Sequence, residues 1–312
     1  MEDSVDLALV RATARDFLGR PRMDREIAAM GWTGLLVAED HGGAGWRPVE
    51  AAVIAAELGR ARAAPSWPGS VVAAGALARW ATAAECERWL PGLLDGTSHG
   101  AVCIGGEARV VGRPDVVVRC GADGLHIADG TGLDLHADDS SLDLERELLV
   151  LSGPPLTGAV VGDADAARTV AAMLRLLLAA DALGALTAAR ERLVEHLRTR
   201  IAFEQPLASF QALQHRLVDL LVLELRSGAI ISRAARACAG DDPGFARIAA
   251  AAHAYVMDHV VPAVDECVQL SGAIGFTWEY ALHRELRRVL ADSILAGSAR
   301  ASRTLVAEAG GW

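Results

Sequence analysis

The C-terminal third of the chain, from about residue 170 to 306, most constrains what its 312 residues can fold into. Two long segments with helical apolar periodicity meet there at Arg200–Asp219, a stretch that contains a single proline, Pro206. Further along, the glycine-containing stretch Gln269–Glu279 separates two more such segments. Four apolar-periodic helices joined by short irregular segments predict a helical bundle. Such joints can hold a ligand on exposed backbone groups and helix N-termini.

The segments before this bundle predict two further parts of the fold. Residues 1–99 have the patterns of several short helices. Residues 100–162 contain short β-rich runs separated by turns such as Gly121–Gly124. Asp163 is a suitable cap for the first bundle helix. We therefore expect a mainly α fold with a small β domain, in which an N-terminal α-helical domain and a small antiparallel β domain precede a C-terminal four-helix bundle at 163–312.

Apolar periodicity and the positions of proline and glycine give the individual elements. Helices are predicted at 6–18, 23–30, 48–60, 70–80, 83–94, 163–199, 206–239, 245–270 and from 279 onward. Strands are predicted at 110–112, 116–120, 125–127, 148–151 and 159–161. Alanine and leucine, which are strong helix formers, dominate the composition and favour this mainly helical interpretation.

Charge, cysteine content and hydropathy exclude several classes of protein. The net charge of −10 argues against nucleic acid as a partner. The five cysteines lack a Cys-x-x-Cys pair, and His215 and His253 lack ligand spacing, so neither a disulfide framework nor a metal site is predicted. Reduced thiols and an acidic N-terminus favour a cytoplasmic protein. Arg175 and Asp181 interrupt the apolar run Ala171–Ala189, which predicts a buried bundle helix and no membrane span.

Four short segments follow one another in an order that points to a family. Gly31–Gly45 reads Gly-Trp-Thr-Gly and ends in Glu-Asp-His-Gly-Gly-Ala-Gly, and Trp89–Gly96 begins Trp-Leu-Pro-Gly. Arg200–Asp219 contains Arg-x-x-Phe, and Gln269–Glu279 reads Gln-Leu-Ser-Gly-Ala-Ile-Gly-Phe-Thr-Trp-Glu. Together with the helix–strand–helix layout, these segments resemble the motifs of the acyl-CoA dehydrogenase family. The Phe-Thr-Trp-Glu form is most similar to actinobacterial members that act on sterol or other bulky acyl-CoA thioesters.

This resemblance implies a reaction, a cofactor and partners. In the family, a glutamate takes the α-proton of an acyl-CoA, and N5 of FAD accepts the β-hydride. The base must reach the α-proton directly, and the flavin must lie on the opposite side of the acyl chain. The bundle mediates oligomerisation in this family. The resemblance therefore implies FAD, an acyl-CoA substrate and a homo- or hetero-oligomer.

The sequence departs from the family where the glutamate should stand. One family position lies in a late Tyr-Glu-Gly-Thr segment, which here reads Leu295–Ser298, so that Ala296 occupies the place of the base. The other lies in a Leu-Glu-Arg context, which here reads Met173–Arg175, so that Leu174 occupies it. Neither alanine nor leucine can accept a proton. The resemblance therefore implies no catalytic residue at either usual place.

Two other carboxylates could serve as an unusual base. Asp181 lies within the apolar run, and Glu279 follows the glycine-containing break. Each has a simpler interpretation. Glu279 can be a first-turn glutamate that favours its helix dipole. Asp181 can be a buried partner of an arginine such as Arg175.

The adenosine-diphosphate end of FAD is bound in the family by residues of a neighbouring subunit. Four residues match those motifs, namely Arg200, Phe203, Gln269 and Gly272, and Ser298 stands where a threonine is usual. An arginine can pair with a pyrophosphate through charge-assisted hydrogen bonds, so Arg200 is the leading candidate. It could also be a plain surface residue at a helix end. Three neighbouring positions depart from the family: Ala202 for Gln, Glu204 for Gly and Ala273 for Gly.

The β domain departs as well. The family's Thr-Glu-Pro-x-x-Gly-Ser-Asp segment, which meets the flavin and the thioester, falls here on Cys103–Val110 without that pattern. These departures imply the short, degenerate subunit of a heterotetrameric acyl-CoA dehydrogenase, which completes a shared FAD site with a full-length partner subunit. Two alternatives remain open. One is a non-catalytic scaffold or regulatory relative that binds no flavin, and the other is a self-sufficient homomeric enzyme with an unusual base.

Overall fold

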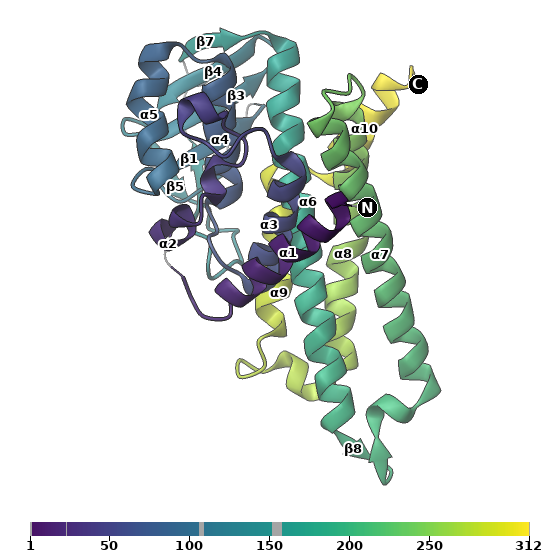
Figure 1. Cartoon of the computed structure of the whole chain (residues 1–312). Coiled ribbons are helices and arrows are strands. Elements are labelled where there is room, and N and C mark those ends of the chain that lie inside the picture. The colour runs from purple at the N-terminus through teal and green to yellow at the C-terminus, as the bar shows by residue number, and fades with distance from the viewer. Residues whose placement is uncertain (1, 23, 106–108, 152–157, 312) are drawn as a thin grey trace.

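The computed structural model describes residues 2–22, 24–105, 109–151 and 158–311. A long helical bundle stands beside a more compact part built of short helices and strands (Figure 1). This arrangement confirms the predicted mainly α fold with a small β region.

The N-terminal part contains five α-helices in the places where the sequence predicts them. Prolines at the first turns of α3 and α4 and a capping box between Thr82 and Glu85 at α5 fix where these helices begin. Two 3₁₀ turns carry the segment of the Gly31–Gly45 motif. The elements are α1 Glu2–Phe17, α2 Asp24–Ala29, η1 Trp32–Gly34, η2 Glu39–His41, α3 Pro48–Ala61, α4 Trp67–Trp80 and α5 Ala83–Asp95.

In the described part of residues 100–162, seven strands form two small sheets. A four-stranded sheet has the order β1-β3-β4-β7, and a three-stranded sheet has the order β2-β6-β5. The prediction of an antiparallel unit is wrong for one pair, because β1 and β3 are parallel. Strand β2, which lies between β1 and β3 in the sequence, pairs in the other sheet. The chain then returns to the first sheet as β3, which runs beside β1 in the same direction. The strands are β1 Gly100–Ile104, β2 Arg109–Val111, β3 Val116–Gly121, β4 Gly124–Asp129, β5 Leu135–Ala137, β6 Leu148–Leu151 and β7 Ala159–Gly162.

Five helices make up the C-terminal part. Their bounds are α6 Ala164–Thr199, α7 Gln211–Ala239, α8 Phe245–Leu270, α9 Leu282–Leu295 and α10 Ala299–Ala309. The predicted cap is confirmed, because the Asp163 carboxylate accepts hydrogen bonds from the backbone N–H groups of Asp165 and Ala166. The predicted single last helix is wrong. It breaks at Gly297, whose φ of 86° no ordinary helix contains.

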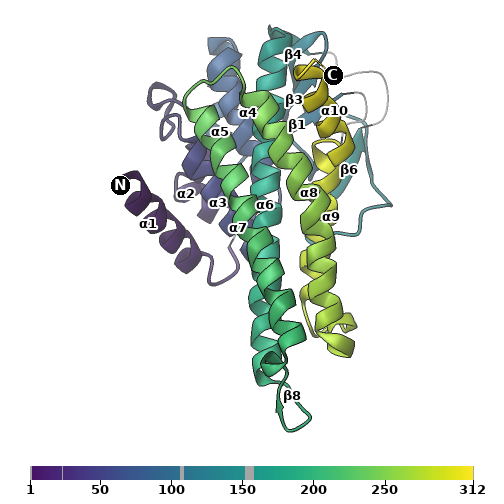
Figure 2. The same cartoon turned by 90° about the vertical axis from the view of Figure 1, so that its right-hand side faces the viewer.

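The predicted start of α7 at Pro206 is also wrong. Pro206 belongs to a short hairpin, β8 Ile201–Ala202 with β9 Gln205–Pro206, and the 3₁₀ turn η3 Leu207–Ser209 precedes the helix. The two turn residues of the β8–β9 hairpin, Phe203 and Glu204, both have positive φ, as a tight hairpin turn requires. This hairpin projects from the lower end of the bundle, beyond α6 and α7 (Figure 2).

Helix α6 is the centre of the molecule. It packs against α3, α7, α8 and α9 and also touches both β3 and β4. Its 36 residues are long and apolar enough to cross a membrane, yet 89% of the most apolar window is buried inside the protein. This burial identifies it as a core helix of the bundle, as the sequence predicts.

Two glycines allow α3 and α6 to cross at close range. A Cβ atom on Gly184 would lie 1.8 Å from the carbonyl oxygen of Ala56, and one on Gly59 would lie 2.0 Å from that of Asp181. These distances are far below van der Waals contact, so any side chain here forces the helices apart. The crossing positions the part of α6 that carries Asp181.

We expect Gly184→Ala to lower the free energy of unfolding by about 2–3 kcal/mol, because the added methyl group overpacks this crossing. Gly228→Ala is the matched control on α7, since its Cβ would meet only Leu183 Cδ2, at 3.8 Å. The control should be neutral or stabilising by up to ~1 kcal/mol, because alanine is the better helix former. Urea unfolding of both variants measures the difference. Equal stabilities would contradict the close crossing.

Candidate functional site

The two positions expected for the catalytic base are buried and apolar. Leu174 lies on α6 with 5% of its surface exposed, and Ala296 ends α9 with none exposed. Leu174 and Leu295, the residue before Ala296, line one cavity that also touches the start of α4 and strands β1 and β2. The structure thus brings both positions to one place, although they are more than a hundred residues apart in sequence.

This cavity cannot hold a thioester as it stands. Its volume is ≈ 30 Å³, about the share of one water molecule, whereas ligand pockets measure roughly 300–1,000 Å³. Among the described residues that line it there is no carboxylate. Its one charged side chain, Arg109, donates a hydrogen bond to Asp138 at 2.8 Å. Among the described residues, this cavity therefore offers neither a base nor space for an acyl chain.

Asp181 is not available as a substitute base. Arg288 holds it through two hydrogen bonds of 2.7 Å, and Arg146 donates a third at 3.3 Å. Burial by itself would raise the pKa of Asp181, but the charges of Arg288 and Arg146 outweigh burial and lower it. The interpretation as a buried ion pair is therefore right, with a different partner. Arg175, named as an example from the sequence, does not pair with Asp181 among the ion pairs of the described residues.

Two further aspartates, Asp292 and Asp143, lie beside Arg146. Asp292 accepts a hydrogen bond from Arg146, and Asp143 lies 3.8 Å from the same guanidinium. Burial raises the pKa of Asp292 well above its ordinary value, and the charge of Arg146 offsets this only in part. A protonated Asp292 leaves two carboxylates, those of Asp181 and Asp143, to balance the guanidiniums of Arg146 and Arg288. We call these five residues the buried ion cluster.

Glu279 is also in the wrong place for a base. It is exposed in the loop between the 3₁₀ turn η4, Gly272–Phe276, and α9. That loop lies at the lower end of the bundle, whereas Ala296 follows α9 at the other end of this 14-residue helix. At a rise of about 1.5 Å per residue, the two ends of α9 are roughly 20 Å apart. Glu279 therefore cannot reach the cavity beside Leu174.

Arg175 lines a second and larger cavity nearer the start of α6. This cavity of ≈ 410 Å³ lies between the ends of β1 and β3 and the helices α6, α8 and α10. Only 8% of Arg175 is exposed, and its Nε atom has no hydrogen-bond partner. Within the described ranges no carboxylate forms an ion pair with it, and burial lowers its pKa. An unpaired buried cation at a cavity wall is suited to an anionic ligand.

Two titratable groups near Arg175 are uncharged. Burial raises the pKa of the Cys120 thiol to about 12. Burial and the charge of Arg175 lower the pKa of His253 to about 3, so its ring is neutral and shares a 3.0 Å hydrogen bond with Ser302. Arg168 and Arg247 also line the cavity, and Asp165 pairs with Arg168. Among the described lining residues, Arg175 and Arg247 therefore leave the cavity with a net positive charge.

The expected contacts to the adenosine-diphosphate group lie at the lower end of the bundle. Arg200 ends α6, and Phe203 stands at the tip of the β8–β9 hairpin with 87% of its surface exposed. Gln269 and Gly272 are exposed at the end of α8, on the same end of the bundle (Figure 1). Ser298 is elsewhere. It caps α10 by accepting a hydrogen bond from the N–H of Ala301, at the far end of α9.

Metal chemistry has no site among the residues that the structure describes. No group of three or more His, Cys, Asp or Glu side chains is placed to hold an ion. Within the segment Cys103–Val110, only part is described. Gly105 donates its N–H to the carbonyl of Cys120 at 3.1 Å, while residues 106–108 lie outside the described ranges.

Comparison with known proteins decides the family. A model of the acyl-CoA dehydrogenase C-terminal domain matches residues 164–311, and one of the N-terminal domain matches residues 7–97. The chain is 30% identical over 272 residues to the acyl-CoA dehydrogenase IpdE2 of Mycobacterium tuberculosis, an alignment that covers 87% of this chain and 80% of that protein. The chain belongs to the acyl-CoA dehydrogenase family. The resemblance seen in the sequence is thereby confirmed.

Solved structures share the fold. A variant of the Tcur3481–Tcur3483 steroid ACAD superimposes with a TM-score of 0.84 at 22% identity, over 98% of this chain and 97% of that one. A glutaryl-CoA dehydrogenase from Mycobacterium smegmatis in complex with FADH2 gives a TM-score of 0.81 at 17% identity, over 97% and 94% of the two chains. Acyl-CoA dehydrogenases are flavoproteins, so FAD is the cofactor of the family to which this chain belongs.

The sequence alone does not reveal the buried ion cluster. Asp181 within an apolar run is a signal that a buried partner exists, but nothing in the sequence identifies Arg146 and Arg288. The unpaired state of Arg175 is equally hidden, because its position on α6 suggests Asp181 as a neighbour. Both features depend on how segments that are distant in the sequence pack against α6.

The same substitution at two aspartates of the cluster should have very different effects on stability. Asp181→Asn leaves Arg288 buried without its carboxylate and should cost about 3–5 kcal/mol of unfolding free energy at pH 7. Asp292→Asn imitates the protonated acid and should change stability by less than ~1 kcal/mol. Guanidinium chloride unfolding measures both. A cost at Asp292 equal to that at Asp181 would show that both aspartates are ionised.

The raised pKa of Asp292 also predicts a pH effect. The folded protein binds this proton more tightly than the unfolded chain, so its contribution to stability is present at acidic pH and is lost as pH rises through the folded pKa. Asp292→Asn should remove this loss and flatten the dependence of stability on pH above about 4. Unfolding curves from pH 4 to 8 test this. An unchanged slope would refute the assignment.

Proposed function

We propose that this chain is the base-deficient subunit of a FAD-dependent acyl-CoA dehydrogenase and completes a shared site with a full-length partner subunit. One observation carries the proposal. Both family positions of the base, Leu174 and Ala296, are apolar and line or adjoin a cavity too small for a thioester. By contrast, Arg200, Phe203, Gln269 and Gly272, four of the five residues expected to contact FAD, are exposed at the lower end of the bundle.

The residues at that end suit the pyrophosphate of FAD. Arg200 and Gln269 are exposed, and within the described residues neither side chain has a hydrogen-bond partner. Gly272 has a φ of 68°, and a Cβ atom there would find no neighbour within 4 Å, so the backbone is open to a ligand. Guanidinium, amide and backbone groups are the donors that bind phosphates. FAD bound there, with its ring in the partner, would supply the acceptor for the β-hydride.

Exposed apolar side chains support assembly with another subunit. On α7, Val218, Leu221, Val222 and Leu225 are exposed and recur at the spacing of one helix face. Phe276 and Trp278 are each 65% exposed near the end of α8. Large exposed apolar groups of this kind are typical of protein interfaces. The partner we propose is an acyl-CoA dehydrogenase chain that retains its glutamate.

The cavity that contains Arg175 is the best candidate for the anionic portion of acyl-CoA. It is large enough for part of such a ligand, and within the described residues the Nε atom of Arg175 has no hydrogen-bond partner. The similarity to IpdE2 and to a steroid ACAD favours a bulky or sterol-derived acyl group. The five cysteines are free and buried, which supports a reduced, cytoplasmic protein.

The alternatives differ in what they require. A self-sufficient enzyme would need Asp181 or Glu279 at the reacting carbon, and neither lies there. A non-catalytic scaffold agrees with the small cavity beside Leu174 and is distinguished by flavin content.

Co-expression with the partner should give a yellow complex, while the chain alone is colourless. A colourless complex would favour the scaffold, and a yellow homomer with one FAD per chain would contradict the shared site.

We expect Arg200→Gln to weaken FAD retention by the complex about tenfold to a hundredfold, because one charge-assisted contact to a phosphate is lost. Arg113→Gln is the matched control, since Arg113 is an exposed arginine on the β2–β3 turn. Flavin absorbance after gel filtration, with fluorescence titration of the stripped complex, gives the ratio. An identical affinity in both variants would exclude Arg200 from the site.

Arg175→Met tests the acyl-CoA cavity with two readouts. If Arg175 is held for a ligand, removing its buried, unpaired charge should leave unfolding free energy unchanged or raise it by about 1–2 kcal/mol. Affinity for acyl-CoA should fall about tenfold to a hundredfold. Calorimetry with the complex measures binding, and urea unfolding measures stability. Lower stability with unchanged affinity would assign Arg175 a purely structural role.

A further inference from the structure

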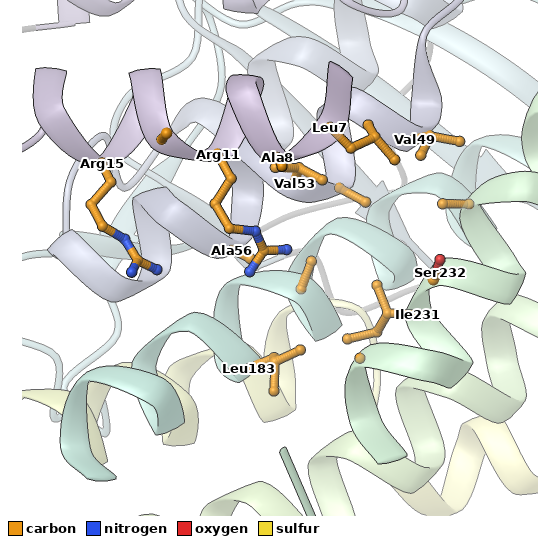
Figure 3. A pocket seen from close by; sticks show the side chains of 15 residues that line it. Leu7, Ala8, Arg11, Arg15, Val49, Val53, Ala56, Leu183, Ile231 and Ser232 are labelled. Atoms are coloured by element: carbon orange, nitrogen blue, oxygen red, sulfur yellow. The ribbon is translucent and has the colours of Figure 1, made fainter. Parts of the chain in front are cut away.

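A third cavity lies between α6 and the helices α1, α3 and α7 (Figure 3). It has a volume of ≈ 500 Å³ and is partly open to solvent. Small side chains face it from all four helices, among them Ala8, Ala52, Ala180 and Gly228. Larger side chains at these positions would fill the space between the helices, whereas alanine and glycine leave it open.

The wall of this cavity is almost entirely apolar. Leucine, valine, isoleucine, alanine and glycine provide most of its surface, and Ser232 contributes one hydroxyl group. Two guanidiniums, those of Arg11 and Arg15, are the only charged groups among the described residues that line it. Both side chains project from α1 in the same direction, toward the helices across the space (Figure 3). One cationic edge on an apolar cavity is suited to an amphipathic anion.

Arg15 and Arg11 differ in how closely they contact Glu57. Arg15 donates hydrogen bonds to both carboxylate oxygens of Glu57, at 3.1 and 3.0 Å. Arg11 comes no closer than 3.8 Å to Glu57, beyond hydrogen-bonding distance, and half of its side chain is exposed. Two guanidiniums against one carboxylate leave one net positive charge. The N–H groups of the Arg11 guanidinium are therefore available to another acceptor.

We infer that this cavity binds an organic carboxylate with an apolar chain or ring body, whose head group pairs with Arg11. The body would lie between α3, α6 and α7, against Ile231 and Leu183. A single net positive charge matches one carboxylate and disfavours a CoA ester, whose phosphates carry several negative charges. None of its lining residues belongs to the proposed flavin or acyl-CoA sites, so the ligand is independent of both.

The test uses the full-length chain, alone or in its complex, with decanoate as the probe and decanol as the uncharged control. Decanoate below its micelle concentration should bind saturably and raise the melting temperature, because a ligand that binds only the folded state stabilises it. Arg11→Gln should weaken this binding about tenfold or more, since a charge-assisted pair is lost. Arg113→Gln should leave it unchanged.

A second variant keeps the inference open to refutation if Arg11→Gln unfolds the protein. Gly228→Leu adds a side chain where a Cβ meets only Leu183 Cδ2 at 3.8 Å, so the fold should accept it while the cavity fills. It should raise the melting temperature of the free protein and abolish the decanoate shift. Non-saturable binding, equal binding of decanol, or equal effects of Arg11→Gln and Arg113→Gln would each overturn the inference.

Discussion

The ion pair between Asp181 and Arg288 joins parts of the molecule that are far apart in the sequence. Asp181 lies on the central helix α6, Arg288 on α9, and Arg146 on the connection that leads into β6. All three are buried, so each charge depends on the others for its solvation. The close approach of α3 at Gly59 covers the same stretch of α6. The cluster therefore fixes α9, and with it the place where Ala296 and Leu174 meet.

That geometry sets the surroundings of the two positions where the resemblance to the family predicts a base. Leu174 and Ala296 are apolar and buried, and the cavity that Leu174 and Leu295 line is small. The neighbouring cavity with Arg175 stays open and cationic, and the far end of the bundle keeps an exposed arginine, an amide and a glycine turn. This combination is what our proposal of an unequal pair of subunits requires.

The overall fold could be predicted because its signals are local. Apolar periodicity predicts the helices, Asp163 predicts the start of α6, and the β-rich runs predict most of the strands. The errors occurred where partners distant in sequence decide the outcome. The parallel pairing of β1 with β3 follows from β2 joining another sheet, and Pro206 lies in a hairpin whose positive-φ turn residues, Phe203 and Glu204, are not residues that normally suggest such a turn.

The candidate site was predictable only in part. Counting along the family motifs placed Leu174 and Ala296, and the structure brings them to one cavity. The same counting could not show that Arg175 is unpaired or that Asp181 already has two guanidinium partners, because both depend on three-dimensional packing. Arg200, Phe203, Gln269 and Gly272 gather at one end of the bundle, whereas Ser298 lies at the break between α9 and α10. Their roles toward FAD stay predictions.

The most direct test of the central claim is anaerobic flavin bleaching by an acyl-CoA in the purified complex after the partner's own glutamate base is changed to glutamine. The account predicts that bleaching stops, because no carboxylate lines the cavity beside Leu174 among the described residues. The unmodified complex should bleach fully under the same conditions. Rapid bleaching in the altered complex would contradict the account, since this chain would then supply a base of its own.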